Sequence, residues 1–232
     1  MELQSLSIAA NLYIPVTFLD KLFTNLSSTL KNVTIPNRWL SSTFRDAFNL
    51  DSLTILNASE HLPMFCCKTK SLTIDNMKLF LKHDVFVARR RKLSPALSLI
   101  NQLNLDHYQV SPEQLGETYW NEVLRNEFSE AMKYFSLIES IKYNIPMTVG
   151  IDIRKTIASY NEFIKEAVKI PPKFVLSFYK FNLMFTFPTF DEYKQLCEGF
   201  EYDESIKNCY CFCKNVQSGG SESTLLEIQF PK

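Results

Sequence analysis

One uninterrupted apolar stripe, between Pro112 and Tyr143, constrains this chain more than any other feature of its sequence. The segment is opened by Ser111 as an N-cap and Pro112 as the first helical residue, and its only glycine is Gly116. A helix of about 30 residues measures about 45 Å, close to the diameter expected for a folded chain of this length. The stripe recurs every three or four residues: Tyr119, Trp120, Val123, Leu124, Phe128, Ala131, Met132, Phe135, Ile138 and Ile141. The sequence therefore predicts one long helix over about 112–143 that crosses the fold or protrudes from it.

Proline opens other segments that have helical spacing, because a missing N–H costs least at the first position of a helix. Helices are expected from Pro15, from Pro36, over Ile74–His83, over Pro95–Leu105 and over Asp152–Lys169. Thr189 followed by Glu192 matches a capping box and predicts a short helix that ends at Gly199.

Runs of β-forming residues predict strands elsewhere in the chain. Strands are expected over Ser52–Leu56, over Met64–Lys68, over Phe174–Phe187 as a central strand, and in a terminal hairpin of Asn208–Gln217 with Thr224–Phe230. The predicted fold class is α+β, with helices at the N-terminus and in the middle and a short mixed or antiparallel sheet that ends in the C-terminal β-hairpin. No internal repeat is evident, and we expect a single domain over 1–232 with a soft boundary near 94–111.

Composition excludes several classes of protein. The 232 residues carry 25 Lys+Arg against 25 Asp+Glu, so no chain-wide basic field exists for polyanions. Only 5 glycines are present, which disfavours glycine-built phosphate loops. No stretch approaches the about 20 apolar residues of a membrane helix, and the first residues lack the positive start of a secretory signal. We therefore expect no membrane association and an intracellular location, nuclear or cytoplasmic, with the nucleus favoured.

Six cysteines give the sharpest local pattern. Cys66 and Cys67 are adjacent, and Cys209, Cys211 and Cys213 alternate, unlike the dispersed cysteines of a small secreted domain. In a strand, alternating thiols share one face but lie about 6.6–7 Å apart by the strand rise, too far for one tetrahedral ion unless the strand bends. The favoured interpretation is buried strand cysteines with no metal. The alternatives are a disulfide or redox role and a metal site formed by Cys197, Cys209, Cys211 and Cys213.

A basic run of four residues, Arg89 to Lys92, is the second local feature. Together with preceding lysines it predicts a patch that could contact phosphates, formed by Lys68, Lys70, Lys78, Lys82, Arg89, Arg90, Arg91 and Lys92. A solvated or protein-binding face is favoured over a nucleic-acid face or a nuclear-import signal, since interleaved apolar residues tie the run to a core.

Catalytic templates are missing from the sequence. The three histidines, His61, His83 and His107, lie in unrelated local contexts, and no P-loop, nucleophile elbow or H-E-x-x-H motif occurs. We therefore expect neither enzymatic activity nor a cofactor.

The leading hypothesis is a non-catalytic subunit of an intracellular multiprotein complex that acts through protein–protein interaction in a hetero-oligomer. The residues expected to bind the partner are Trp120, Leu124, Phe128 and Phe135, on the stripe of the long helix. Two alternatives remain: a DNA- or RNA-associated protein that uses the basic patch Lys68–Lys92, and a zinc-stabilised module around Cys197–Cys213.

Overall fold

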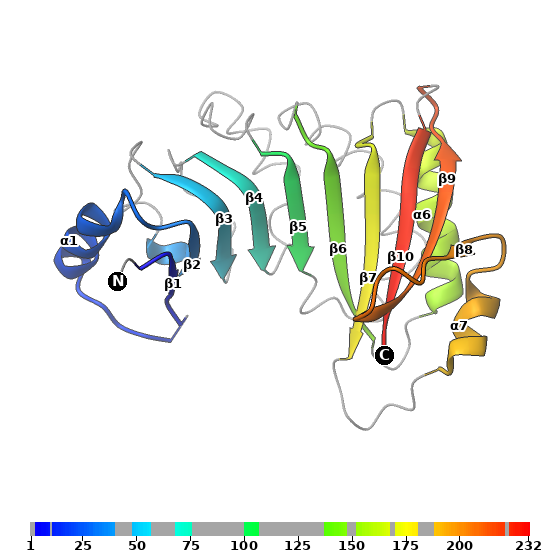
Figure 1. Cartoon of the computed structure of the whole chain (residues 1–232), viewed down its shortest axis with the longest axis horizontal. Helices are drawn as coiled ribbons and strands as arrows, with labels where there is room; N and C mark the ends of the chain where they lie inside the picture. Colours follow the sequence, from blue (N-terminus) through cyan, green and yellow to red (C-terminus); the bar gives the residue numbers. More distant parts are fainter. Residues whose placement is uncertain are drawn as a thin grey trace. The chain divides into compact units, whose positions relative to one another are not determined.

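The chain forms two compact units of helices and strands (Figure 1). The computed structural model describes residues 3–9, 11–39, 48–56, 68–75, 100–106, 137–147, 152–167, 170–180, 188–220 and 223–232. Unit 1 comprises Met1–Asp106 with Lys133–Ile138, and unit 2 comprises His107–Met132 with Glu139–Lys232. Three α-helices and ten strands lie in the described ranges, so the predicted α+β class is confirmed. The β-structure is larger than the short sheet expected from the sequence.

Unit 1 contains five parallel strands that neighbour one another in chain order, β1-β2-β3-β4-β5. Its elements are β1 (Ser5–Ser7), α1 (Val16–Leu26), β2 (Asn32–Pro36), the 3₁₀ turn η1 (Asn37–Trp39), β3 (Asn49–Leu56), β4 (Lys68–Asp75) and β5 (Gln102–Asp106). Helix α1 follows Pro15, as predicted, and buries Leu19 and Phe23. The ring of Phe23 meets that of Phe48 edge to face, with centroids 5.7 Å apart.

Four of these strands share a short repeat. Residues 32–35, 52–55, 71–74 and 102–105 are in register and have the sequences Asn-Val-Thr-Ile, Ser-Leu-Thr-Ile, Ser-Leu-Thr-Ile and Gln-Leu-Asn-Leu. The second position of each is at most 3% exposed, in Val33, Leu53, Leu72 and Leu103. The expectation of no internal repeat was therefore wrong. The repeat is hard to see in the sequence because only four residues recur and the connections between them differ in length. Stacked parallel strands in chain order are typical of solenoid proteins, in which each repeat buries its apolar positions against the next.

Unit 2 contains five strands in the order β6-β7-β10-β9-β8. Its elements are β6 (Ser140–Met147), α6 (Ile153–Glu166), β7 (Lys173–Lys180), α7 (Phe190–Leu196), β8 (Glu201–Tyr202), β9 (Cys209–Gln217) and β10 (Ser223–Pro231). Strands β6, β7 and β10 are parallel, whereas β10, β9 and β8 pair antiparallel. The predicted terminal hairpin is therefore confirmed as β9 and β10.

Aromatic side chains fill one face of this sheet, the face that α6 and α7 cover. Tyr160 of α6 lies 5.5 Å from Tyr143 of β6 and 5.4 Å from Phe174 of β7, measured between ring centroids. Tyr193 of α7 stacks on Phe230 of β10 at 4.1 Å. Figure 1 shows α6 behind β10 and β9 in this view. Because successive side chains alternate between faces, the residues between these aromatics point to the opposite side of the sheet.

Both predicted helix starts in unit 2 are confirmed by their caps. The Asp152 carboxylate accepts a hydrogen bond from the Lys155 backbone N–H at 3.0 Å. At α7 the Thr189 hydroxyl accepts from the Glu192 N–H, and the Glu192 carboxylate accepts from the Thr189 N–H at 2.6 Å. That second bond is the main reason why the pKa of Glu192 lies below its usual range. Together the two bonds satisfy backbone donors that have no partner inside the helix.

Three helix predictions are wrong in part, because some of their residues form parallel strands instead. The end of the long helix expected over 112–143 is strand β6, in which Ile141, Tyr143 and Ile145 alternate into the core. The last residues of the helix expected over Pro95–Leu105 likewise form strand β5. Strand β4 extends to Asp75, into the start of the helix expected over Ile74–His83. In short runs an apolar spacing of three or four residues cannot be told from alternation, and tertiary pairing decides.

Other predicted segments are only partly described. Where the helix expected from Pro36 should begin, Pro36 itself ends β2 and the 3₁₀ turn Asn37–Trp39 follows. Residues 40–47 lie outside the described residues. The central strand expected over Phe174–Phe187 is found as β7, which is described to Lys180. The remainder of the long helix, residues 112–136, and the expected strand Met64–Lys68 up to residue 67 lie outside the described residues.

Gly219, in the turn between β9 and β10, lies against the end of α6. A Cβ atom at this position would stand 3.0 Å from the Glu166 carbonyl oxygen and 3.1 Å from that of Lys165. Both obstacles are backbone atoms, so the turn or the helix end has to shift to admit a methyl group. We expect Gly219→Ala to destabilise the protein by about 1–2 kcal/mol, measured by urea denaturation followed by circular dichroism. An unchanged unfolding midpoint would show that the hairpin turn does not rest on α6.

Candidate functional site

Polar side chains occupy one face of the unit 1 sheet in two rows. They come from the strand positions that alternate with the buried leucines and isoleucines, so they point away from the apolar side. None of them is buried, and we call them the polar ladder: Ser5, Asn32, Ser52, Ser71 and Gln102 in one row, and Ser7, Thr34, Thr54, Thr73 and Asn104 in the other.

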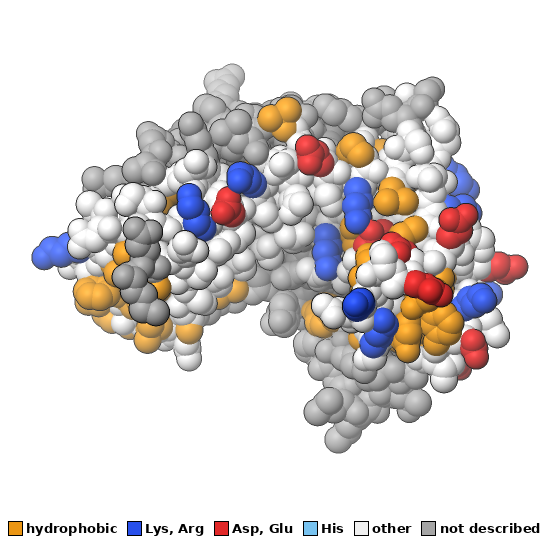
Figure 2. Space-filling model, viewed as in Figure 1, with side chains coloured by type: hydrophobic (Ala, Val, Ile, Leu, Met, Phe, Trp, Pro, Cys, Tyr) orange, Lys and Arg blue, Asp and Glu red, His pale blue; other side chains and the backbone are white. Residues whose placement is uncertain are grey.

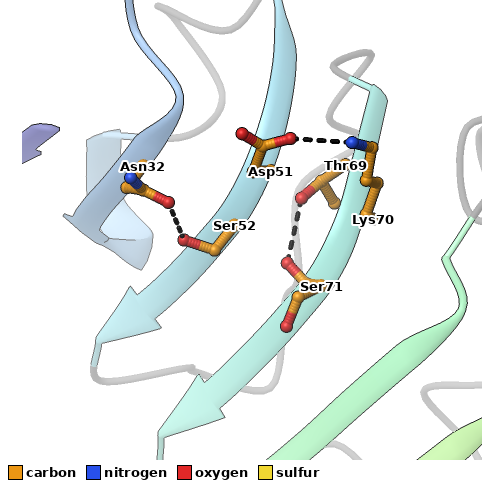
Figure 3. Close-up of polar contacts among 6 residues, drawn as sticks. All are labelled: Asn32, Asp51, Ser52, Thr69, Lys70 and Ser71. Atoms are coloured by element: carbon orange, nitrogen blue, oxygen red, sulfur yellow. Dashed lines mark hydrogen bonds and ion pairs between the residues drawn. The ribbon is translucent and has the colours of Figure 1, made fainter. Parts of the chain in front are cut away.

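Hydrogen bonds link the polar ladder across neighbouring strands. The Ser52 hydroxyl donates to the Asn32 side-chain carbonyl at 2.8 Å (Figure 3). The Asn32 amide donates in turn to the Ser5 hydroxyl at 3.2 Å, and the Asn104 amide donates to the Thr73 hydroxyl at 3.1 Å. These bonds hold the rotamers of short side chains that remain partly open to solvent.

One ion pair lies at the start of β3 and β4, beside the polar ladder. The Lys70 ammonium is 2.9 Å from the Asp51 carboxylate, and its hydrogen bond is the main reason why the pKa of Asp51 lies below its usual range (Figure 3). Lys70, predicted as part of a basic patch, therefore has an acidic neighbour. Lys68 lies at the start of β4, and the other six patch residues, Lys78, Lys82, Arg89, Arg90, Arg91 and Lys92, lie outside the described residues.

Exposed apolar side chains gather around α1, at the β1 end of unit 1. Tyr13 is 84% exposed and Phe18 is 57% exposed, and Leu12 and Val16 are also exposed. Figure 2 shows hydrophobic side chains close together at this end of the unit. Large exposed rings of this kind are typical of surfaces that bind another protein.

A pair of thiols lies on the unit 2 sheet, on the face opposite the one that α6 and α7 cover. The sulfur atoms of Cys211 and Cys213 are 3.7 Å apart, so the expectation of about 6.6–7 Å was wrong. The strand rise fixes the spacing of the backbone, but the two side chains lean toward each other. One ligand oxygen of Asp203 and both sulfurs lie within 4.8 Å of one another. Strand pairing brings this carboxylate to the thiols, since the Asp203 N–H donates to the Cys211 carbonyl at 2.8 Å.

The other two candidate cysteines do not join this cluster. Cys197 caps the end of α7, where burial raises the pKa of its thiol to about 12. Cys209 lies two residues before Cys211 on the same strand face and is half-buried. Burial is the main cause that raises the pKa of the thiols of Cys209, Cys211 and Cys213. All of these side chains are therefore neutral thiols near pH 7 unless a cation displaces the proton.

A buried carboxylate lies next to the thiol pair. Glu227 of β10 is the register partner of Cys213, and its side chain is only 3% exposed. The Lys173 ammonium is 2.5 Å from one of its oxygens, and the Gln229 amide donates to the other. Lys142 donates to the Gln229 carbonyl at 3.1 Å. Lysine and acidic side chains adjoin on this face in Figure 2.

Sequence reasoning missed both the polar ladder and Asp203. The ladder has a signal, since Ser-Leu-Thr-Ile occurs twice, at 52–55 and 71–74, but four residues at uneven intervals are easily overlooked. Asp203 has no local signal, because only the pairing of β8 with β9 brings it to the cysteines. The residues predicted to bind a partner, Trp120, Leu124, Phe128 and Phe135, lie outside the described residues.

Among the described residues, no helix has the length and apolar character required to cross a membrane. Comparisons with protein families, with curated proteins and with solved structures found no match for this chain.

Proposed function

We propose that this protein is a non-catalytic binding subunit that recognises another protein through the polar ladder of unit 1. The observation that supports this most strongly is a parallel sheet with one polar, partly exposed face. Parallel sheets are usually covered on both faces. Solenoid proteins are the exception, and they use such stacked strands as binding surfaces.

The chemistry of the ladder favours a polar protein partner. Hydroxyl and amide groups both donate and accept hydrogen bonds, so they can pair with the backbone and the polar side chains of a bound segment. Their short side chains lose little entropy on binding. Because the two rows carry no charged residue, we expect binding that depends weakly on salt.

The exposed apolar side chains around α1 support the same function. Tyr13 and Phe18 offer large rings that gain free energy when a partner removes them from water. A partner that spans β1 and α1 would contact both polar hydrogen-bonding groups and apolar anchors, the usual composition of a protein interface.

Affinity purification of the full chain from its native cells, with mass spectrometry of the proteins that copurify, tests the proposal. Asn32→Arg replaces an exposed ladder residue with a long charged one and removes two hydrogen bonds. Asn215→Arg, at an exposed position of β9 in unit 2, is the matched control. We expect Asn32→Arg to reduce recovery of the partner by about tenfold or more, as for loss of a central interface residue, and Asn215→Arg to leave it unchanged.

Two outcomes would contradict this proposal. Equal recovery with both variants would exclude the ladder as the contact surface. Recovery that disappears after nuclease treatment or falls steeply with salt would favour the nucleic-acid alternative, because phosphate contacts release counterions.

A further inference from the structure

We propose that Asp203, Cys211 and Cys213 form a three-ligand Zn²⁺ site on unit 2. The proposal is independent of the protein-binding function, because all three residues belong to β8, β9 and their connection. The main observation for the site is the distance of 3.7 Å between the sulfur atoms of Cys211 and Cys213. Two thiolates at about 2.3 Å from one tetrahedral zinc ion lie about 3.8 Å apart, so the pair already has the spacing of one edge of the tetrahedron.

Asp203 supplies a third ligand of suitable chemistry. One of its oxygens lies within 4.8 Å of both sulfurs, so the carboxylate has to approach the sulfurs only moderately to share one ion with them. The Ser205 N–H donates to Asp203 Oδ1 at 2.9 Å, and this bond orients the carboxylate. Metal-bound carboxylates usually have such an outer hydrogen bond. Two thiolates with one carboxylate favour zinc over calcium or magnesium, which prefer oxygen ligands alone.

The surroundings favour the anionic form of Asp203, whereas burial and the negative charge of Glu227 raise the pKa of both thiols, so the ion itself has to displace their protons. The hydrogen bonds from Ser205 are the main reason why the pKa of Asp203 lies below its usual range. The neighbouring Glu227 carboxylate adds a negative charge, which the Lys173 ammonium balances. Zn²⁺ has to displace two thiol protons, so its affinity should rise steeply with pH. Three protein ligands leave the fourth position of the tetrahedron to a water molecule.

Metal titration of the reduced full-length chain tests this site. The apoprotein is prepared with a chelator and a thiol-free reductant, and bound Zn²⁺ is measured by elemental analysis after desalting. Co²⁺ serves as a spectroscopic probe, because thiolate ligands give an intense near-ultraviolet charge-transfer band and tetrahedral geometry gives strong visible bands. We expect one ion per chain and a higher midpoint of thermal unfolding with Zn²⁺ than without it.

The variants separate this ligand set from the other cysteines. Cys211→Ser and Cys213→Ser should each lower Zn²⁺ affinity by more than about a hundredfold, and Asp203→Asn by about ten- to a hundredfold. Cys209→Ser, on the same strand face, and Cys197→Ser, at the end of α7, should keep full stoichiometry and the cobalt spectrum. Should a serine variant fail to fold, Asp203→Asn and the cobalt spectrum of the unaltered chain still decide.

Several results would overturn the site. They are a reduced chain that binds no Zn²⁺, a cobalt complex without the thiolate band, an unchanged affinity in Asp203→Asn, and an equal loss in Cys209→Ser. An intact mass two hydrogens lower under reducing conditions would also overturn it, since it would show that Cys211 and Cys213 form a disulfide.

Discussion

Phe174→Ala should destabilise unit 2 by about 3–5 kcal/mol, which is the usual cost of truncating a fully buried phenylalanine. Phe174 has no exposed surface, and its ring contacts those of Tyr143, Tyr160 and Phe163 at centroid distances of 5.5, 5.4 and 6.3 Å. The ring therefore joins β6, β7 and α6. Its loss removes apolar burial and leaves a cavity that three surrounding rings fill only partly. Urea denaturation followed by circular dichroism measures the effect.

Two further variants make that result specific. Phe174→Leu keeps much of the apolar volume but loses the ring contacts, so its stability should fall between those of the original chain and Phe174→Ala. Phe18→Ala, at a ring that is 57% exposed on α1, should change stability by less than about 0.5 kcal/mol. Equal losses for Phe18→Ala and Phe174→Ala would contradict the packing of α6 on the sheet.

Lys173→Met is expected to cost about 3 kcal/mol, because it leaves the buried carboxylate of Glu227 without its cation. Glu227 is 3% exposed at the side chain, and among the described residues the Gln229 amide is then the one hydrogen-bond partner that remains. The loss should fall at the lower end of the range for a broken buried ion pair because the Lys173 side chain is 40% exposed. The free energy of unfolding should be measured in the presence of a chelator, so that metal binding does not contribute.

A double variant tests the cause of this loss. Lys173→Met with Glu227→Gln removes both charges and keeps a side chain of similar size, so it should be more stable than Lys173→Met alone. Such a rescue is the signature of a coupled pair in a double-mutant cycle. If the two substitutions are simply additive, the carboxylate does not depend on Lys173.

The helices that could be predicted from the sequence are those whose starts are marked by residues within one helical turn. Pro15 before α1, Asp152 before α6 and the Thr189–Glu192 capping box each act within one helical turn, and all three helices begin where these residues placed them. The hairpin of β9 and β10 is also local, since its strands adjoin in sequence and alternate regularly. Caps and turns satisfy backbone groups close in the chain, so they need no tertiary partner.

Of the parallel strands, β3 and β7 were expected from the sequence, but β5 and β6 could not be predicted in the same way. Strand β5 pairs with β4 and strand β6 with β7, across connections that a short apolar run does not reveal. Residues 137–143 fit a helical stripe as well as an alternating strand when they are taken alone. In the folded chain this segment is a strand, because every second residue, Ile141, Tyr143 and Ile145, is buried on one face of the sheet.

Sequence by itself thus determined the α+β class, the starts of three helices and the terminal hairpin, because hydrogen bonds between near neighbours encode them. Only the tertiary structure decided the polar ladder, which needs five strands in register, and the closeness of Asp203 to Cys211 and Cys213. The physical reason is that strand pairing joins residues far apart in the chain, and the orientation of each side chain then follows from its register.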